Sequence, residues 1–138
     1  MIIDATDLIL GRMAAVVAKK AILGETVDII NCENTVITGT RDFILKKYQQ
    51  KRAMGVPKKG PFYSRLADRF VRRSIRGMLS YKKPRGSEAY KRIMCYLGAP
   101  EKFNGKKIET IEKANISKVS NLKYITVGEI CKVLGAKQ

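Results

Sequence analysis

Histidine and tryptophan are absent from this 138-residue chain, and the first absence limits the chemistry open to the protein. Histidine is the residue that most often serves as a general acid or base near neutral pH. Without it such work would fall to carboxylates, lysine or tyrosine, yet the 12 acidic residues are scattered along the chain. Asp4 and Asp28 are expected to serve turns or strand ends. The sequence therefore gives no positive indication of an enzyme.

Cysteine is scarce as well, and its spacing fits no known kind of cysteine site. The three cysteines, Cys32, Cys95 and Cys131, are odd in number, lie far apart and form no CxxC pair. With no histidine to complete a ligand set, a metal site is not expected, and neither is a disulfide framework. We expect three reduced, buried thiols in a cytosolic protein, with no metal and no cofactor.

Long apolar runs are missing too, which excludes a membrane span. No segment approaches the roughly 18 uninterrupted apolar residues that a span requires. The opening MIIDATDLIL has neither the basic start nor the long apolar core of a signal peptide. The hydrophobic fraction of 45% suits one domain with a real core. We expect a soluble, intracellular protein.

Negative charge is scarce where positive charge is most concentrated. The chain has 28 basic and 12 acidic residues, a net charge of +16. Residues 1–40 carry a net −2, residues 41–92 carry +14 from 17 bases and three acids, and residues 93–138 carry +4. Like charges at this density repel one another and weaken the compact state. An excess of this kind indicates a polyanionic partner, with nucleic acid first and an anionic membrane second.

The N-terminal third predicts a strand–helix–strand unit. Apolar residues spaced at i, i+3, i+4 and i+7 predict a helix over residues 10–21, with Asp7 as its cap and Gly24 at its C-terminus. Three stretches rich in apolar and β-branched residues flank or follow this helix and are strand candidates: residues 1–5, 26–31 and 35–38. This order predicts a βαβ unit and a parallel sheet.

The rest of the chain predicts further helices separated by irregular loops. In the first of these helices, at residues 41–53, Phe43, Ile44 and Tyr48 are expected to face the core. Ser64 and Ser87 are expected to cap the two helices that follow. Helices are predicted at residues 41–53, 65–79 and 87–91, loops at 54–64 and 80–86, and a buried strand at 93–97. Beyond Gly98 the chain is polar and rich in turns until a β-rich stretch at 124–127 and a last short amphipathic piece.

The helix predicted at 65–79 has one basic and one apolar face. At about 100° per residue its arginines fall within an arc of roughly 100°. These arginines are Arg65, Arg69, Arg72, Arg73 and Arg76, and the apolar residues on the other side are Leu66, Phe70, Val71, Ile75 and Met78. A merely solvated face usually mixes signs, whereas this one has only Asp68 near it. Because arginine makes forked contacts with phosphate, we predict contact with nucleic acid.

Two glycine-containing stretches are candidates for phosphate sites. Gly55 and Gly60 have the spacing of a phosphate loop, but Pro61 and Phe62 stand where that motif needs lysine and serine or threonine. It is therefore not a nucleotide-triphosphate site. The turn after Thr38 follows a predicted strand, where parallel sheets often bind phosphate, although a structural turn is favoured there.

Several short motifs occur in a fixed order along the chain: Ile3-Asp4-Ala5, Leu10 to Ala14, Asn31 to Asn34, Ile37 to Gly39, Arg76 to Leu79, Lys82, Arg85-Gly86, Lys91-Arg92 and Tyr96 to Gly98. In this order and spacing they resemble a known family, that of ribosomal large-subunit protein thirteen, in its archaeal and eukaryotic branch. The match covers residues 2 to about 98 and recurs loosely at 122–135. It departs at Met13 and Cys32, where leucine and alanine are more usual, and at Ser80, where proline is common.

The resemblance implies both a fold and a function. It implies a three-layer α/β/α fold around a four-stranded parallel sheet, without enzymatic activity. We expect one domain over 1–138, with an α/β core at 1–98, a basic RNA-facing segment at 41–92 and a C-terminal extension at 99–138. The function implied is a structural one in the large subunit of cytoplasmic ribosomes. The expected partners are large-subunit ribosomal RNA and other large-subunit proteins, with a role in early assembly and no small-molecule substrate or membrane partner.

Folded RNA is recognised mostly through its shape, phosphates and 2′-hydroxyls, so we assign the basic residues to phosphate contacts. Tyr48, Phe62, Tyr63 and Tyr81 are candidates for stacking on unpaired bases, although packing or loop anchoring is favoured for each. Two alternatives stay open: a basic protein of DNA or chromatin, and an α/β nucleotide-binding enzyme that uses the turn after Thr38. The predicted RNA-binding residues are Arg12, Arg41, Lys46, Lys47, Lys51, Arg52, Lys58, Lys59, Arg65, Arg69, Arg72, Arg73, Arg76, Lys82, Lys83, Arg85, Lys91 and Arg92.

Overall fold

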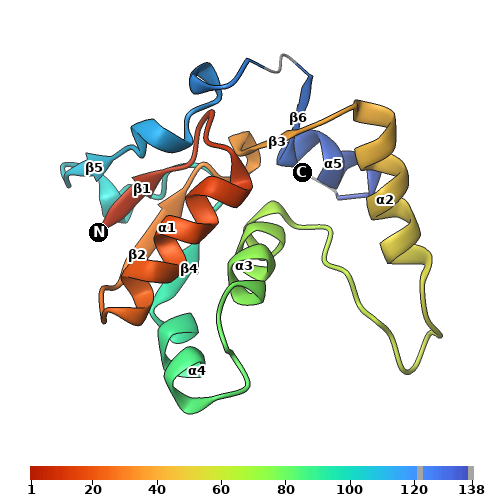
Figure 1. Ribbon diagram of the computed structural model, residues 1–138, viewed down its shortest axis with the longest axis horizontal. Coiled ribbons are helices and arrows are strands. Elements are labelled where there is room, and N and C mark those ends of the chain that lie inside the picture. Colours follow the sequence, from red (N-terminus) through yellow and green to blue (C-terminus); the bar gives the residue numbers. More distant parts are fainter. Residues whose placement is uncertain (121–122, 137–138) are drawn as a thin grey trace.

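A four-stranded parallel sheet forms the centre of the computed structural model, which describes residues 1–120 and 123–136 (Figure 1). The sheet has the order β4-β2-β1-β5, with β1 at Ile2–Asp4, β2 at Val27–Ile30, β4 at Ile93–Cys95 and β5 at Ile108–Glu109. The α-helices of the described residues are α1 (Leu10–Ile22), α2 (Arg41–Ala53), α3 (Ala67–Gly77), α4 (Pro84–Lys91) and α5 (Val127–Val133). The α/β class and the four-stranded parallel sheet are confirmed.

The membership of that sheet differs from the prediction in one strand. The strand predicted at 35–38 forms β3 (Val36–Thr38), which pairs antiparallel with β6 (Tyr124–Thr126) in a separate two-stranded sheet. The fourth parallel strand is instead β5, which pairs with β1 and comes from the stretch predicted to be polar and turn-rich. Two residues are too few to show a strand periodicity, so only the pairing reveals β5.

One face of the sheet carries the core. Ile3, Ile29 and Cys95 lie side by side across three strands and are buried in the cluster that also contains the α1 side chains. All six apolar residues predicted for the buried face of α1 are buried: Leu10, Met13, Ala14, Val17, Ala18 and Ala21. The 3.6-residue periodicity thus located the core-facing side of this helix correctly.

The opposite face of the sheet has a thinner cover. Ile2, Asp28 and Met94 form the neighbouring row, and Met94 is 39% exposed. The connection from β4 to β5 reverses direction along the sheet, so a right-handed crossover carries it over this face. That connection contains the 3-10 helix η2 (Glu101–Phe103), whose buried Phe103 ring lies 5.3 Å from the ring of Tyr96. Ile30, on the same face, is 1% exposed, so this face is covered as well, and η2 forms part of that third layer.

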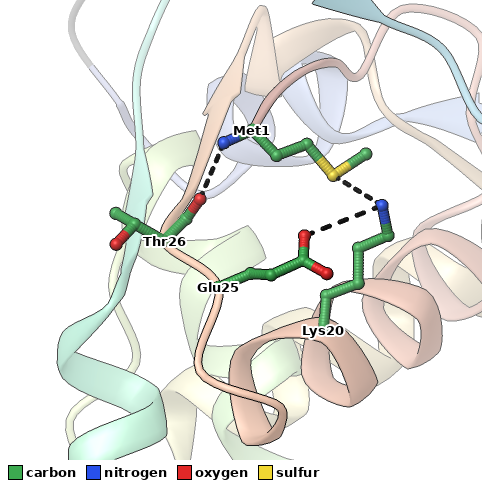
Figure 2. Close-up of polar contacts among 4 residues, drawn as sticks. All are labelled: Met1, Lys20, Glu25 and Thr26. Atoms are coloured by element: carbon green, nitrogen blue, oxygen red, sulfur yellow. Dashed lines mark hydrogen bonds and ion pairs between the residues drawn. The ribbon is translucent and has the colours of Figure 1, made fainter.

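The start of β1 is tied to the turn that leads into β2 (Figure 2). The amino group of Met1 donates to the carbonyl oxygen of Thr26 at 2.9 Å. The Nζ atom of Lys20 lies 2.9 Å from Sδ of Met1 and 3.9 Å from a carboxylate oxygen of Glu25. These contacts join α1, β1 and β2 in the part of the chain where charges are balanced.

Several predicted helix ends were wrong. Asp7 does not cap α1; it has a left-handed φ of 57°, and the cap position is Ile9. The oxygen of Ser64 accepts from the amide of Leu66, and Leu66 is the cap of a helix that begins only at Ala67. The fourth helix begins at Pro84 rather than after Ser87, because proline fits the first turn of a helix. Gly24 ends α1 as predicted, with a left-handed φ of 104°.

Three apolar side chains predicted to face the core are exposed. Phe43 is 68% exposed, whereas Ile44 beside it is buried and Tyr48 is half-buried. In Figure 1 α2 lies beside α5 at the edge of the molecule, so only one side of this helix can face the core. Leu66 and Met78, at the two ends of α3, are 37% and 46% exposed.

Gly86 allows α4 to approach the preceding loop, which gives a test of the packing. A Cβ atom at Gly86 would lie 2.2 Å from the carbonyl oxygen of Ser80, whereas one at Gly11 in α1 meets nothing within 4 Å. We expect Gly86→Ala to lower the free energy of unfolding by about 1–3 kcal/mol through overpacking. The matched variant Gly11→Ala should raise it by up to about 1 kcal/mol. Urea unfolding followed by circular dichroism measures both, and equal effects would contradict the close approach.

Candidate nucleic-acid interface

The basic helix α3 is anchored by its apolar face. Phe70, Val71 and Ile75 are completely buried, and the helix packs against α1 and β4. The ring of Phe70 lies 4.9 Å from that of Tyr48 and 5.8 Å from that of Tyr63. The arginines therefore lie on the side away from the core, as the predicted division into two faces requires.

Tyrosine rings lie under three of the α3 guanidiniums. These arginines are half-buried, and the distance from Cζ to the ring centroid is 4.4–4.9 Å, within the range of a cation–π interaction. Such stacking limits the motion of the guanidinium but leaves its charge uncompensated. The pairs are Arg72 on Tyr90, Arg73 on Tyr63 and Arg76 on Tyr81. Sequence reasoning missed them, because the tyrosines belong to other segments and follow no helical spacing.

Arg73 also connects α3 to the loop before it. Its Nη1 atom donates to the carbonyl oxygen of Phe62 at 2.6 Å, while the guanidinium stacks on the adjacent Tyr63. Tyr63 in turn packs against Tyr48 of α2, with 5.8 Å between the ring centroids. The end of the 54–64 loop is thereby held between α2 and α3.

Acidic partners for this positive charge are rare. In the ranges 1–120 and 123–136 two ion pairs occur, Lys20 with Glu25 and Arg92 with Glu88, each at 3.9 Å. Arg92 is therefore the one base of the 41–92 segment with an acidic partner among the described residues, and it also donates to the carbonyl oxygen of Ala21 at 3.3 Å. The segment's net charge of +14 remains available to an external anion.

The predicted RNA-binding residues lie along one continuous course of the chain. Figure 1 shows α2, the extended 54–64 loop, α3 and α4 on the side of the molecule away from β5. Arg12 is separate, on α1, where it donates to the carbonyl oxygen of Lys113 at 3.4 Å. Arg72, Arg73, Arg76 and Arg92 are half-buried, and the exposed members are Arg12, Arg41, Lys46, Lys47, Lys51, Arg52, Lys58, Lys59, Arg65, Arg69, Lys82, Lys83, Arg85 and Lys91.

Two of these arginines line a concave part of the surface. Arg65 and Arg69 border a pocket of about 600 Å³ between the start of α3 and the end of α5. Arg65 donates to the carbonyl oxygen of Gly135 at 3.2 Å, which holds its guanidinium at the rim. Among the described residues the lining of the pocket contains two arginines and no acidic side chain, so these residues favour an anion such as phosphate.

In both candidate phosphate loops, glycine or lysine amides donate to carbonyl oxygens within the fold. Gly39, after Thr38, donates its amide to the carbonyl oxygen of Lys123 at 2.8 Å, and the preceding strand is antiparallel. The amides of Lys59 and Gly60 both donate to the carbonyl oxygen of Val56. The nucleotide-enzyme alternative therefore loses its structural basis, because the parallel-sheet site it requires is not formed there.

The thiols and Asp4 have pKa values that are shifted by their surroundings in the fold. Burial raises the pKa of Cys131 to about 11, and a hydrogen bond with Cys32 together with burial raises the pKa of Cys95. All three thiols are buried and free, as predicted, and protonated thiols are poor nucleophiles. Partial burial raises the pKa of Asp4, but hydrogen bonds from Asn31 and Thr6 outweigh it and lower the value, which fits the turn role expected for Asp4.

The described residues contain neither a metal-binding cluster nor a membrane-spanning helix. No group of three or more histidine, cysteine, aspartate or glutamate side chains is placed to hold a metal ion. Within the same residues no helix has the length and apolar character needed to cross a membrane.

Together the fold and the surface define a basic α/β protein whose positive side chains are arranged for a polyanion. Residues 1–102 match the family described as ribosomal protein L13, and the chain belongs to this family. It is 45% identical over 133 residues to the large ribosomal subunit protein uL13 of Picrophilus torridus, covering 96% of this chain and 95% of the relative. The uL13 proteins of Methanocaldococcus jannaschii and Methanopyrus kandleri are 44% identical over 140 residues and 43% identical over 136. These alignments cover 99% and 97% of this chain, and 98% and 86% of the relatives. The predicted resemblance is confirmed.

The two contacts of Arg73 predict that it also supports the fold, unlike Arg69, which is exposed. We expect Arg73→Gln to lower the free energy of unfolding by about 1–2 kcal/mol, since it removes a cation–π contact and a charged hydrogen bond. Arg69→Gln should change it by no more than about 0.5 kcal/mol. Thermal melts of the free protein compare the two. Equal stability of both variants would show that the contacts of Arg73 add nothing to the fold.

The half-buried Tyr63 predicts a loss of stability at alkaline pH. Burial, with a smaller effect of the neighbouring Tyr48, raises the pKa of Tyr63 to about 12 despite the opposing effect of Arg73. Because the unfolded value is about 10, the neutral phenol stabilises the folded state below pH 10. That contribution is lost as the pH rises from about 10 through about 12.

Urea unfolding of the wild type and of Tyr63→Phe over this pH range tests the effect. The difference in free energy of unfolding between the two should shift in favour of Tyr63→Phe as the pH rises, because phenylalanine has no proton to lose. Tyr124→Phe, at an exposed tyrosine of β6, is the matched control for removing a phenol hydroxyl and should show no such shift. A constant difference between the wild type and Tyr63→Phe would contradict the assignment.

Proposed function

We propose that this chain is a structural constituent of the large ribosomal subunit and binds the subunit's ribosomal RNA through the 41–92 segment. One observation carries the proposal: a segment with a net charge of +14 has one acid-paired base among the described residues. The family and the uL13 relatives, which are named as large-subunit proteins, support the same role. The role is structural rather than catalytic.

Phosphate neutralisation is the main source of affinity in this proposal. The protein binds the RNA through its backbone and shape, since base edges in A-form helices are poorly accessible to side chains. The stacked arginines Arg72, Arg73 and Arg76 lose little further freedom on binding because the tyrosines already restrict them. The lysines of α2 and of the 54–64 loop supply contacts that are more adaptable.

The position in the ribosome implies further partners. As a large-subunit protein of the cytoplasmic ribosome, the chain contacts neighbouring ribosomal proteins as well as RNA, and it takes part in early subunit assembly. The whole chain acts as one unit in this proposal, because the 99–138 extension supplies β5 to the sheet and β6 to the strand pair with β3. Co-sedimentation with large subunits in a high-salt gradient is the direct test of membership.

A titration in salt tests the phosphate contacts. The logarithm of the affinity for purified large-subunit ribosomal RNA should fall with the logarithm of salt concentration with a slope of several units. Lys58→Gln, in the exposed 54–64 loop, should reduce that slope by about 1. Lys19→Gln, an exposed lysine of α1 in the charge-balanced part of the chain, is the matched control and should leave it unchanged.

Competition with duplex DNA distinguishes the chromatin alternative in the same assay. Duplex DNA should displace the ribosomal RNA only at much higher concentration if folded RNA is the partner. An affinity that barely changes with salt, or DNA that competes equally well, would contradict the proposal.

A further inference from the structure

Phe62 is an exposed aromatic ring in the middle of the basic surface. Its side chain is 71% exposed, although it lies near the core-packed Tyr63 in sequence. Lys58 and Lys59 precede it in the same loop and are both exposed. A largely exposed apolar ring gains little from burial in the free fold, and in a basic loop its position fits contact with a ligand that is both aromatic and anionic.

The ring is held against the backbone on one side. A Cβ atom at Gly60, whose φ is +78°, would lie 3.0 Å from Cδ2 and 3.1 Å from Cε2 of Phe62, so the ring edge rests directly over this glycine. The carbonyl oxygen of Phe62 accepts from Arg73 at 2.6 Å. Ring and backbone are therefore both positioned, and much of the ring surface remains open to solvent.

We propose that the open side of Phe62 is a stacking site for an unpaired nucleobase of the bound RNA. The inference rests on the proposed function and adds a base contact to its phosphate contacts. Every base has a π face, so stacking on an aromatic side chain needs no particular sequence, and unpaired bases in loops and bulges are the usual partners. Lys58 and Lys59, two exposed cations of the same loop, supply phosphate contacts beside that base in this proposal.

Two substitutions at Phe62 separate stacking from apolar contact. Phe62→Leu keeps an apolar side chain but removes the π face, and it should weaken binding to large-subunit ribosomal RNA by about tenfold. Phe62→Tyr keeps the ring and should bind within about twofold of the wild type. Neither change removes a charge, so the salt slope should stay the same. Because the side chain is largely exposed, thermal melts should show both variants folded.

Fluorescence tests the contact directly, because the chain contains no tryptophan. In Phe62→Trp the emission reports on position 62 alone, and stacking on a base should quench it when large-subunit ribosomal RNA is added. Heparin, a polyanion without bases, should bind the same cations and leave the emission nearly unchanged. Leu23→Trp, at an equally exposed residue after α1, is the control position and should not be quenched by either.

The outcomes separate this inference from the proposed function. Normal RNA affinity of Phe62→Leu, or equal quenching of the Phe62→Trp emission by heparin and RNA, overturns the stacking site while leaving phosphate binding intact. If Phe62→Leu binds RNA normally but enters large subunits poorly, Phe62 contacts a protein and the inference is likewise wrong. Failure of the wild type to bind ribosomal RNA contradicts the proposed function itself.

Discussion

Repulsion among the cations of residues 41–92 is the constraint that the rest of the structure must satisfy. The basic helix α3 stays folded because burial of its apolar face stabilises it more than repulsion among its arginines destabilises it. Burying side chains such as Phe70, Val71 and Ile75 stabilises by about 1.5–3 kcal/mol each. A like-charge pair at i, i+4 costs only a few tenths of a kcal/mol on an exposed helix. Apolar packing therefore outweighs the repulsion in the free protein.

The tyrosines under the arginines hold these cations in place without adding negative charge. Acidic partners would also hold Arg72, Arg73 and Arg76 in place, but they would cancel the charge that an anionic partner requires. An aromatic ring attracts the cation through its quadrupole and leaves the net charge unchanged. These three arginines are thus held in place while their positive charge is kept.

The fold separates these tasks along the chain. Residues 1–40, with a net charge of −2, build β1, α1 and β2, where the one close acid–base pair of the N-terminal region joins Lys20 to Glu25 among the described residues. The 41–92 segment crosses from α2 to α4 before the chain returns to the sheet as β4. Residues beyond Gly98 then supply β5 and β6, which complete the two sheets. The basic segment is therefore inserted between parts of the chain that together form the scaffold.

The sequence by itself determined the features that depend on neighbours along the chain. The 3.6-residue period located the buried face of α1, the bounds of α2 and the two faces of α3, and the composition identified the basic segment. The tertiary structure decided what depends on distant residues. Val36–Thr38 joined Tyr124–Thr126 rather than the parallel sheet, and the two residues of β5 became a strand only by pairing with β1. Phe43 is exposed because α2 lies at the edge of the molecule, and Arg76 meets Tyr81 because a turn brings the loop back under the helix. Helical periodicity is a local property of the chain, whereas strand pairing and side-chain stacking are set by which segments the fold brings together.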